Sequence, residues 1–220
     1  MFDDTHRLPW LEQLNPEQRA AVTHRGGPLL ILAGAGTGKT ATLCTRVAWL
    51  LAGGVPAPRI LLLTFTRRAA REMTQRAHVL ARRVAPDAGR VLGGTFHSIA
   101  HRMVRLHASS LGLGQGFSLL DAADACDLMD LVREELGQAA GRRRFPRAQT
   151  MLDIYSRAIN ASAPLAAVLA EAFPWCEEHR DALAQCFRAY GARKRALALL
   201  DLDDLLLYCC LLYTSDAADE

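Results

Sequence analysis

A glycine-rich segment near the start of the chain has the residue types that bind nucleotide phosphates. Glycines let consecutive backbone N–H groups turn towards a phosphate, and the first turn of a following helix adds partial positive charge. Lys39 is expected to reach the β- and γ-phosphates, and the Thr40 hydroxyl to help hold Mg²⁺. The segment fits the pattern G-x-x-x-x-G-K-[ST], except that Ala33 replaces its first glycine. The predicted phosphate-binding loop consists of Ala33, Gly34, Ala35, Gly36, Thr37, Gly38, Lys39 and Thr40.

Such a loop requires a strand before it and a helix after it, and the flanking residues predict both. Residues 29–33 are a short apolar run typical of a buried strand. Residues 39–51 have helical periodicity and precede Gly53 and Gly54, which favour a helix end. An ordinary glycine-rich turn is the alternative, but this context favours ATP or GTP binding.

The next part of the chain continues the alternation of strand and helix. Residues 60–65 predict a second strand, and apolar side chains at helical spacing predict a helix over residues 69–80. Residues 90–96 predict a weaker third strand, followed by a helix that reaches Leu106. Strands and helices that alternate in this way build a parallel sheet covered by helices.

Beyond Gly116 the strand signals disappear and the chain becomes rich in alanine and leucine. Helical periodicity predicts helices over residues 121–136 and 181–200, which indicates a helical subdomain. The arginine-rich residues 141–147 are predicted to join two of its helices.

Composition excludes two broad classes of protein. Hydrophobic residues make up 50% of the chain and charged residues 22%, which excludes an intrinsically disordered chain. The longest strongly apolar run, residues 205–213, is shorter than the ~20 residues that cross a bilayer. The polar N-terminus lacks the features of a secretory signal. We therefore expect a cytoplasmic protein without membrane contact.

Cysteine content and net charge indicate no function of their own. The six cysteines include no C-x-x-C pair and no histidine at zinc-finger spacing, so we expect buried thiols. Lys and Arg outnumber Asp and Glu by 26 to 23, and a net charge of +3 is too small to indicate nucleic-acid binding.

Four blocks of sequence, in this order and spacing, resemble the superfamily 1 DNA helicases of the UvrD/Rep type. Residues 14–22 (LNPEQRAAV) resemble the Q-motif of that family, and the phosphate-binding loop follows. Residues 63–73 (LTFTRRAAREM) resemble motif Ia, and residues 94–98 (GTFHS) resemble motif Ib. Weaker matches at residues 117–121 and 200–206 extend the resemblance, which spans roughly residues 11–208.

The resemblance implies an α/β fold, a RecA-like P-loop NTPase parallel sheet with an inserted all-helical subdomain. It places the first part of the ATP-binding domain in residues 1–107, the helical insertion in 108–197 and a return to the ATP-binding domain in 198–208. Residues 209–220 are expected to be a tail that does not match the family. No apolar strand ends in the Asp-Glu pair of a Walker B motif, so we expect the domain to be incomplete at the C-terminus.

The resemblance also implies a role for Gln18, which would hydrogen-bond the adenine edge and select ATP. The residues alone allow a second interpretation, because Asn15, Pro16 and Gln18 fit a capping box at the start of a helix. Both interpretations can hold together. Ala41 stands where many relatives carry an arginine that packs on adenine, so that contact is not expected here.

Motifs Ia and Ib imply contact with single-stranded DNA. Thr64 and Thr66 would lie near the phosphate backbone and Phe65 near a base. The motif Ib residues that would line the same strand are Thr95, His97 and Ser98. The residues alone also allow a core position for Phe65, a helix N-cap at Thr66 and a structural role for His97.

A run of arginines in the helical part allows two interpretations. It consists of Arg142, Arg143, Arg144 and Arg147. Such runs are usually solvated loops. Contact with the phosphates of duplex DNA is the more specific alternative.

These features predict the N-terminal part of an ATP-dependent 3′ to 5′ DNA helicase, the polarity coming from the resemblance alone. Its cofactors would be ATP and Mg²⁺, its partners single-stranded DNA and duplex junctions, and Lys39 and Thr40 would act in catalysis. The alternatives are a helicase–nuclease motor of the RecB or AddA type, a non-catalytic nucleotide- or DNA-binding module, and a P-loop kinase. Without a Walker B pair, we expect this chain alone to show no DNA-stimulated ATP hydrolysis.

Overall fold

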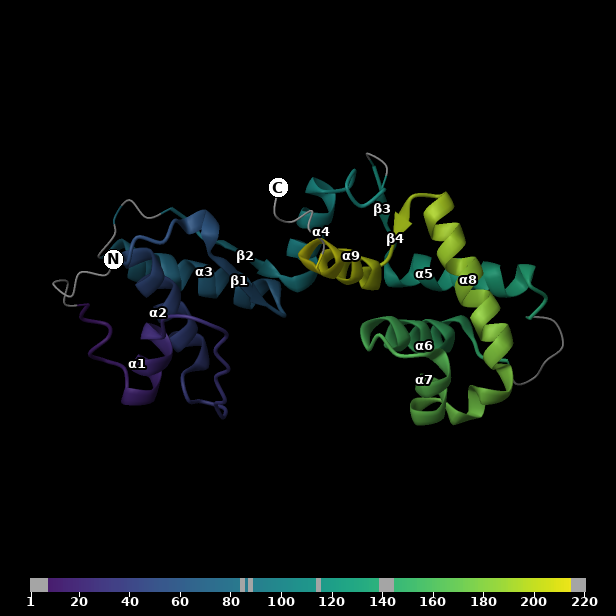
Figure 1. Cartoon of the computed structure of the whole chain (residues 1–220), viewed down its shortest axis with the longest axis horizontal. Helices are drawn as coiled ribbons and strands as arrows, with labels where there is room; N and C mark the ends of the chain where they lie inside the picture. Colours follow the sequence, from purple (N-terminus) through teal and green to yellow (C-terminus); the bar gives the residue numbers. More distant parts are fainter. Residues whose placement is uncertain (1–7, 84–85, 87–88, 114–115, 139–144, 215–220) are drawn as a thin grey trace. The chain divides into compact units, whose positions relative to one another are not determined.

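The computed structural model describes residues 8–83, 86, 89–113, 116–138 and 145–214, and its helices and strands are labelled in Figure 1. The chain forms two compact units, residues 1–99 and residues 100–220. Each unit has buried side chains of its own, and the second has two separate clusters of them.

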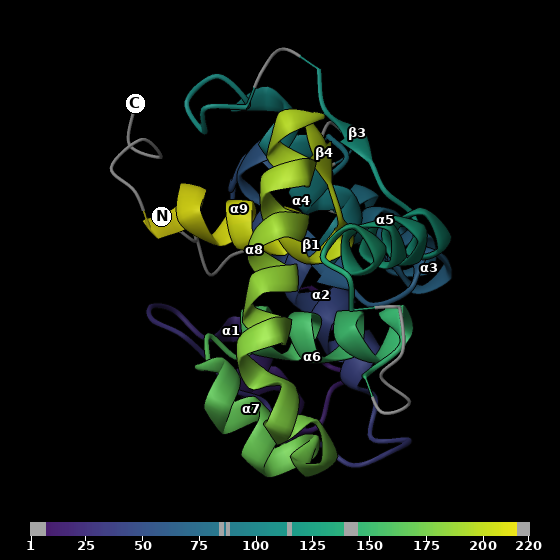
Figure 2. The same cartoon turned by 90° about the vertical axis from the view of Figure 1, so that its right-hand side faces the viewer.

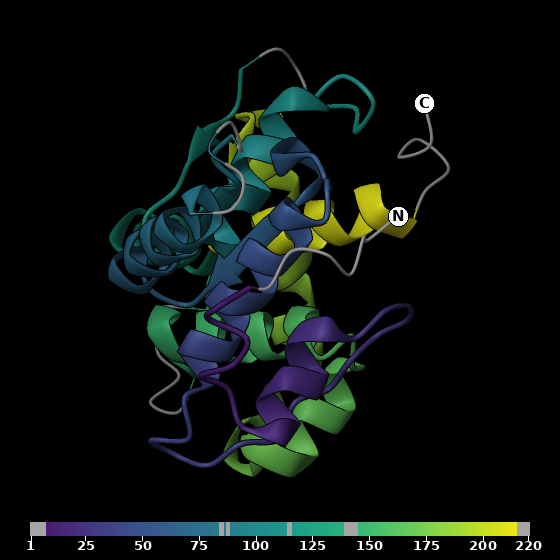
Figure 3. The ribbon, with the colours of Figure 1, turned by 90° about the vertical axis from the view of Figure 1, so that its left-hand side faces the viewer.

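The first unit combines helices with a small parallel sheet. Its elements are α1 (Pro16–Thr23), α2 (Lys39–Ala52), the 3₁₀ turn η1 (Ala57–Arg59), β1 (Leu61–Thr64), α3 (Arg67–Arg82), β2 (Leu92–Thr95) and the start of α4 (Phe96–Leu106). The strands β1 and β2 pair in parallel, with Leu61 opposite Leu92 and Thr64 opposite Thr95. Helix α3 connects the two strands and packs against both of them and against α2 (Figures 1 and 3). The predicted strands over 60–65 and 90–96 are confirmed, as are the predicted helix between them and the predicted helices before and after them.

Small side chains bring α2 and α3 together. Ala48 of α2 and Ala77 and Ala81 of α3 are fully buried, and a side chain of one methyl group lets two helices approach closely. Leu62 from β1 and Trp49 from α2 are among the larger buried side chains of this core. The apolar stripe of α3 therefore decides which face of that helix turns inward.

The prediction of a buried strand at residues 29–33 is wrong. The structure has no strand there, and the side chains of Leu30 and Leu32 are 81% and 86% exposed. A strand forms only when a neighbour accepts and donates ladder hydrogen bonds, and within the described residues β1 and β2 pair only with each other. An apolar run like residues 29–33 is typical of a strand buried on both faces, but the described residues do not cover this segment.

The second unit is mostly helical. Its elements are β3 (Ser118–Leu119), α5 (Ala122–Glu135), α6 (Ala148–Asn160), α7 (Leu165–Ala172), the 3₁₀ segment η2 (Pro174–His179), α8 (Arg180–Ala196), β4 (Leu199–Leu200) and α9 (Leu202–Thr214). Helix α8 begins on the side of α7 and ends beside β4, as Figures 1 and 2 show. The predicted helices correspond to α5, which Asp121 caps by accepting hydrogen bonds from Ala123 and Asp124 N–H groups, and to α8.

The expectation that strands end at Gly116 is wrong, because β3 and β4 form a second parallel pair. Ser118 lies opposite Leu199, and Leu119 lies opposite Leu200. Two residues are too few to show the period-2 alternation that reveals a strand in sequence. This pair joins the two ends of a segment that is helical in between.

The predicted linker lies partly outside the described residues, which exclude Arg142, Arg143 and Arg144. Arg147 is exposed at the residue that precedes α6.

The prediction of buried thiols is confirmed for three of the six cysteines. Cys44, Cys176 and Cys186 are buried, whereas Cys126 and Cys209 are partly buried and Cys210 is exposed on α9. Among the helices that the structure describes, none is long and apolar enough to cross a membrane.

Candidate functional site

The glycine-rich loop between residue 33 and α2 has the backbone shape that its glycines allow. Gly36 and Gly38 have φ angles of 77° and 84°, in the left-handed region that side chains with a Cβ disfavour. The Thr37 hydroxyl donates a hydrogen bond to the Gly34 carbonyl at 2.8 Å and closes the loop on itself. Left-handed turns of this kind are one way in which a loop directs backbone N–H groups towards an anion.

Lys39 lies across the mouth of this loop. Its Nζ atom donates to the carbonyl oxygens of Ala33 at 3.0 Å and Gly34 at 2.6 Å, and the residue is exposed. The ammonium group is thus held at the loop by backbone contacts alone, with no carboxylate partner among the described residues. A phosphate that enters the loop meets a cation that no described acidic side chain neutralises.

The first turn of α2 remains open to a ligand. Its N-cap, Gly38, provides no side-chain hydrogen bond, and the turn contains no acidic residue. The first N–H groups of a helix have no partner within the helix, and the helix dipole favours an anion at this end. Thr40 is exposed at the second residue of α2 and makes no side-chain hydrogen bond to a described residue. A hydroxyl in this position can bind a cation that a nucleotide brings with it.

Gln18 connects α1 to the loop. Its side-chain oxygen accepts from the Asn15 N–H at 3.2 Å, and Asn15 Oδ1 accepts from the Gln18 N–H at 2.8 Å, so the capping box is present. The other end of the same amide, Nε2, donates to the Thr37 carbonyl at 3.0 Å. The capping interpretation is confirmed, and Gln18 also lies at the loop.

The parallel register brings the two other predicted blocks together. Thr64 ends β1 and Thr95 ends β2, and these residues are paired partners. The Thr-Phe sequence of residues 64–65 is therefore repeated at the same level of the neighbouring strand by residues 95–96. Parallel strands end at the same edge of a sheet, which is where α/β proteins place their ligands.

Phe65 and Phe96 form an aromatic pair at this edge. Their ring centroids are 5.5 Å apart and the rings are inclined by 44°. Phe65 is 88% exposed, so the alternative that places it in the core is wrong, and Phe96 is 42% exposed. Phe96 was not predicted, although the repeated Thr-Phe at the ends of two predicted parallel strands was a signal that could have found it.

The hydroxyl groups at this edge have local partners. Thr66 caps α3 by accepting from the Ala69 N–H at 3.2 Å, which confirms the N-cap interpretation. Thr95 accepts from the Ser98 N–H at 3.2 Å, and the two hydroxyls lie 3.1 Å apart. His97 is exposed.

A buried ionic cluster that the sequence did not reveal lies in the second unit, around the block 200–206. Lys194 Nζ donates to Asp201 at 2.5 Å and to Asp204 at 2.6 Å, and the Tyr190 hydroxyl donates to Asp201 at 3.0 Å. Asp201 and Asp204 also accept each other's backbone N–H groups, as in a capping box at the start of α9. The signal in the sequence was the Asp-x-x-Asp spacing before an apolar helix.

The ionisation of this cluster follows from burial and charge together. Burial by itself would raise the pKa of Asp201, but the charge and hydrogen bond of Lys194 outweigh it and the pKa ends below its usual value. The pKa of Asp204 is raised by burial and by the neighbouring Asp201 charge. The two carboxylates keep the pKa of Lys194 above its usual value against the effect of burial. The cluster is a structural centre of the second unit.

The glycine-rich loop, the open helix start behind it and the parallel β1–β2 pair are features of P-loop domains of the RecA-like α/β class. The family model of the UvrD/REP helicase N-terminal domain matches residues 14–219. The chain belongs to this family. The matched range includes residues 209–219, which the sequence assigned to a tail outside the family pattern.

Curated relatives agree with the family. The chain is 39% identical over 200 residues to the ATP-dependent DNA helicase UvrD1 of Mycobacterium tuberculosis, covering 89% of this chain and 25% of that protein. It is 41% identical over 126 residues to the ATP-dependent DNA helicase PcrA of Bacillus subtilis, covering 57% and 17%. It is 34% identical over 229 residues to UvrD2 of M. tuberculosis, covering 96% and 31%. The chain thus spans between about a sixth and a third of the length of these relatives.

Proposed function

We propose that this chain is the ATP-binding part of an ATP-dependent DNA helicase that moves 3′ to 5′ on single-stranded DNA towards duplex junctions. The observation that carries the proposal is the parallel β1–β2 register, which pairs Thr64 with Thr95 and brings Phe65 and Phe96 together in the same unit as a P-loop. A nucleotide loop alone fits many enzymes. An exposed aromatic pair at the ligand-binding edge of the sheet favours a single-stranded nucleic acid as the second ligand.

The nucleotide site consists of the loop over residues 33–40 together with Gln18. Lys39 binds the β- and γ-phosphates, and leaves its carbonyl partners when a phosphate replaces them. Gln18, anchored at Thr37, presents its amide beside the loop and selects adenine. Thr40 would supply a hydroxyl to the Mg²⁺ that accompanies the nucleotide. The described residues contain no group of three His, Cys, Asp or Glu side chains that could hold a metal.

The DNA site consists of the ends of β1 and β2. A base stacks on Phe65, with Phe96 as a second platform beside it, because every base has a face that stacks on an aromatic ring. Thr64, Thr66, Thr95, His97 and Ser98 surround this platform, and His97 is exposed where a phosphate can reach it. The hydroxyls of Thr66, Thr95 and Ser98 already have local partners, so their contribution is smaller than that of the rings.

The helical part of the second unit is an insertion into the ATP-binding domain, over residues 108–197. The support is the β3–β4 pair, in which residues 118–119 meet residues 199–200. A segment whose two ends meet can be inserted into a loop of another domain with little strain. Residues 198–208 then return the chain to the ATP-binding domain.

Titration with a fluorescent ATP analogue tests the nucleotide site. Lys39→Ala should weaken binding strongly, whereas Arg59→Ala, an exposed cation on η1, should bind like the wild type. Equal affinity for Lys39→Ala and Arg59→Ala would remove Lys39 from the site.

Anisotropy with a labelled oligodeoxynucleotide tests the DNA site. Phe65→Ala should cost on the order of 1–3 kcal/mol of binding free energy if a base stacks there. Trp175→Ala is the matched control, because Trp175 is an aromatic residue of the second unit that is 65% exposed.

Unwinding and DNA-stimulated ATP hydrolysis, measured on the whole protein and on its Lys39→Ala variant, test the helicase activity. A whole protein that binds both ligands but releases no phosphate would be a binding module and not a motor.

A further inference from the structure

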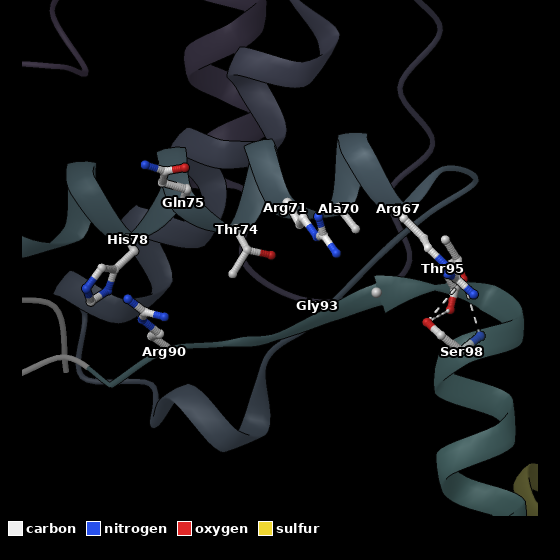
Figure 4. A pocket seen from close by; sticks show the side chains of 11 residues that line it. Arg67, Ala70, Arg71, Thr74, Gln75, His78, Arg90, Gly93, Thr95 and Ser98 are labelled. Atoms are coloured by element: carbon white, nitrogen blue, oxygen red, sulfur yellow. Dashed lines mark hydrogen bonds between the residues drawn. The ribbon is translucent and has the colours of Figure 1, made fainter.

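A groove of about 750 Å³ lies between α3 and β2 in the first unit (Figure 4). Arg67, Arg71, Thr74 and His78 line it from α3, and their spacing of three and four residues puts them on one face of that helix. Figure 4 shows these side chains directed from α3 towards β2, with Arg90 beside His78 at one end and Thr95 and Ser98 at the other. The groove is therefore an elongated channel along the helix.

Gly93 keeps the floor of the groove open. A Cβ at this position would collide with Oγ1 of Thr74, so only glycine allows that threonine to lie over the strand. Within the described part of the chain, the Thr74 hydroxyl has no hydrogen-bond partner. It is free to donate to a ligand in the groove.

The groove carries positive charge that the described residues leave uncompensated. Among the described residues no Asp or Glu lines it, and Arg67, Arg71 and Arg90 make no ion pair with any of them. Arg68, on the neighbouring face of α3, does have such a partner in Glu72 at 2.9 Å. Three guanidinium groups with free N–H donors attract an anion that can fill the space between them.

His78 adds one more unsatisfied group. Its Nδ1 atom is buried and has no hydrogen-bond partner in the described structure. A buried polar atom without a partner costs free energy, and a rotation of the imidazole that brought Nδ1 to the groove would let an anion there remove that cost.

The length of the groove selects between kinds of anion. His78 follows Arg67 by eleven positions, which is about 16 Å along a helix at 1.5 Å per residue. A single phosphate would reach only one or two of these groups, whereas a phosphodiester chain would pass all of them. Arginines and hydroxyls are the side chains that usually hold such a backbone.

We propose that this groove binds the phosphodiester backbone of single-stranded DNA that continues past Thr95 and Ser98. The inference rests on the proposed function, because it extends the DNA path from the Phe65–Phe96 platform along α3 to Arg90. It adds Arg67, Arg71, Thr74, His78 and Arg90 to the residues that contact DNA.

Anisotropy with labelled oligodeoxynucleotides of about 4 and about 16 nucleotides, the range of site sizes in single-strand-binding domains, tests the inference. The variant is Arg71→Gln/Arg90→Gln, and the control is Arg76→Gln, which neutralises an exposed arginine of α3 outside the groove. The double variant should bind the longer oligonucleotide about tenfold more weakly, with a salt slope smaller by about 1.4, or 0.7 for each lost contact. Its affinity for the shorter one should be unchanged. Arg71→Lys, which keeps the charge, should recover part of the loss, and unchanged melting curves should show that all variants fold.

Three results would overturn the inference. The first is a double variant that binds the longer oligonucleotide as Arg76→Gln does. The second is displacement of that oligonucleotide from the wild type, but not from the double variant, by inorganic phosphate at constant ionic strength, which would make the groove a site for free phosphate. The third is a wild type that binds neither oligonucleotide, which would remove the proposed DNA platform as well.

The Phe65→Ala variant distinguishes DNA binding by the groove from DNA binding by the aromatic platform. If it weakens both oligonucleotides while the arginine variant has no effect, the proposed function stands and the groove inference fails. If only the arginine variant has an effect, the groove binds DNA and the aromatic platform does not.

Discussion

Gln18 shows how one amide can serve two neighbouring structures. Its oxygen completes the capping box of α1, and its nitrogen holds the Thr37 carbonyl of the phosphate-binding loop. An N-cap contact contributes about 0.5–2 kcal/mol to stability. The hydrogen bond from Gln18 to the Thr37 carbonyl contributes to nucleotide binding if it holds the loop in the conformation that binds phosphate.

Gln18→Ala should therefore lower both stability and affinity for an ATP analogue. Asn15→Ala is the matched variant, because it removes the N-cap oxygen and leaves the Gln18–Thr37 bond. We expect Asn15→Ala to lose about 1 kcal/mol of stability and to keep its nucleotide affinity. Thermal unfolding and analogue titration of both variants measure the two effects, and equal affinities would show that Gln18 acts only as a cap.

The buried cluster around Lys194 predicts that its two carboxylates contribute unequally to the stability of the fold. Asp201 has a lowered pKa, so its charged form is stabilised by folding, whereas the raised pKa of Asp204 means that its charge is disfavoured. At neutral pH, Asp201→Asn should cost about 3 kcal/mol of unfolding free energy, the size expected when one partner of a buried pair is removed. Asp204→Asn should cost less, and urea unfolding of both variants compares them.

The pH dependence of this difference has a defined sign. A carboxyl whose pKa is lowered on folding contributes stability that is present above its unfolded pKa and is lost as the pH falls through its folded pKa. The stability gap between wild type and Asp201→Asn should therefore shrink below about pH 4, the ordinary carboxyl range. A gap that grows on acidification would contradict the assigned direction.

At the scale of elements, β1 and residues 29–33 have similar composition and opposite environments. Leu62 of β1 is 6% exposed in the core with α2 and α3, whereas Leu32 is 86% exposed. Hydrophobic residues alone do not make a strand stable, because the strand also needs a paired neighbour and a cover.

This contrast predicts that replacing leucine by alanine lowers the unfolding free energy by very different amounts in the two segments. Leu62→Ala should lower the unfolding free energy by about 2–5 kcal/mol, as expected for a buried leucine. Leu32→Ala should change it by less than about 0.5 kcal/mol, as expected for an exposed position. Chemical denaturation of the two variants measures both changes in unfolding free energy. A large loss for Leu32→Ala would mean that residues 29–33 are covered in solution.

At the scale of the whole molecule, the small net charge conceals an uneven distribution between the two units. Residues 1–99 contain 13 Lys and Arg against 6 Asp and Glu, a charge of +7, and residues 100–220 contain 13 against 17, a charge of −4. A positively charged unit attracts nucleic acid even when the chain as a whole is close to neutral.

Binding of single-stranded DNA should therefore depend on salt through the first unit. Arg67→Gln, in the first unit, should reduce the slope of log K against log salt concentration by about 0.7, the value for one phosphate contact on a single strand. Arg188→Gln, an exposed arginine of the second unit, should leave the slope unchanged. Anisotropy titrations at several salt concentrations measure both slopes, and equal reductions would place DNA on both units.

The sequence by itself determined the local features, because these depend on residues close together in the chain. The glycines of residues 34–38, the capping box at Asn15, the N-cap at Thr66 and the helices α2, α3, α5 and α8 were all predicted from short patterns. Family membership followed from several such blocks in their order. Phe96 was within reach of the same reasoning, because the Thr-Phe repeat was visible.

Only the tertiary structure decided which segments lie beside one another and which side chains are covered. It exposed Leu30 and Leu32, paired the two-residue strands β3 and β4, and buried Lys194 with Asp201 and Asp204. The arginine-lined groove between α3 and β2 is also a feature of the tertiary structure alone. Burial, strand pairing and charge neutralisation depend on neighbours that are distant in sequence, and no local pattern specifies those neighbours.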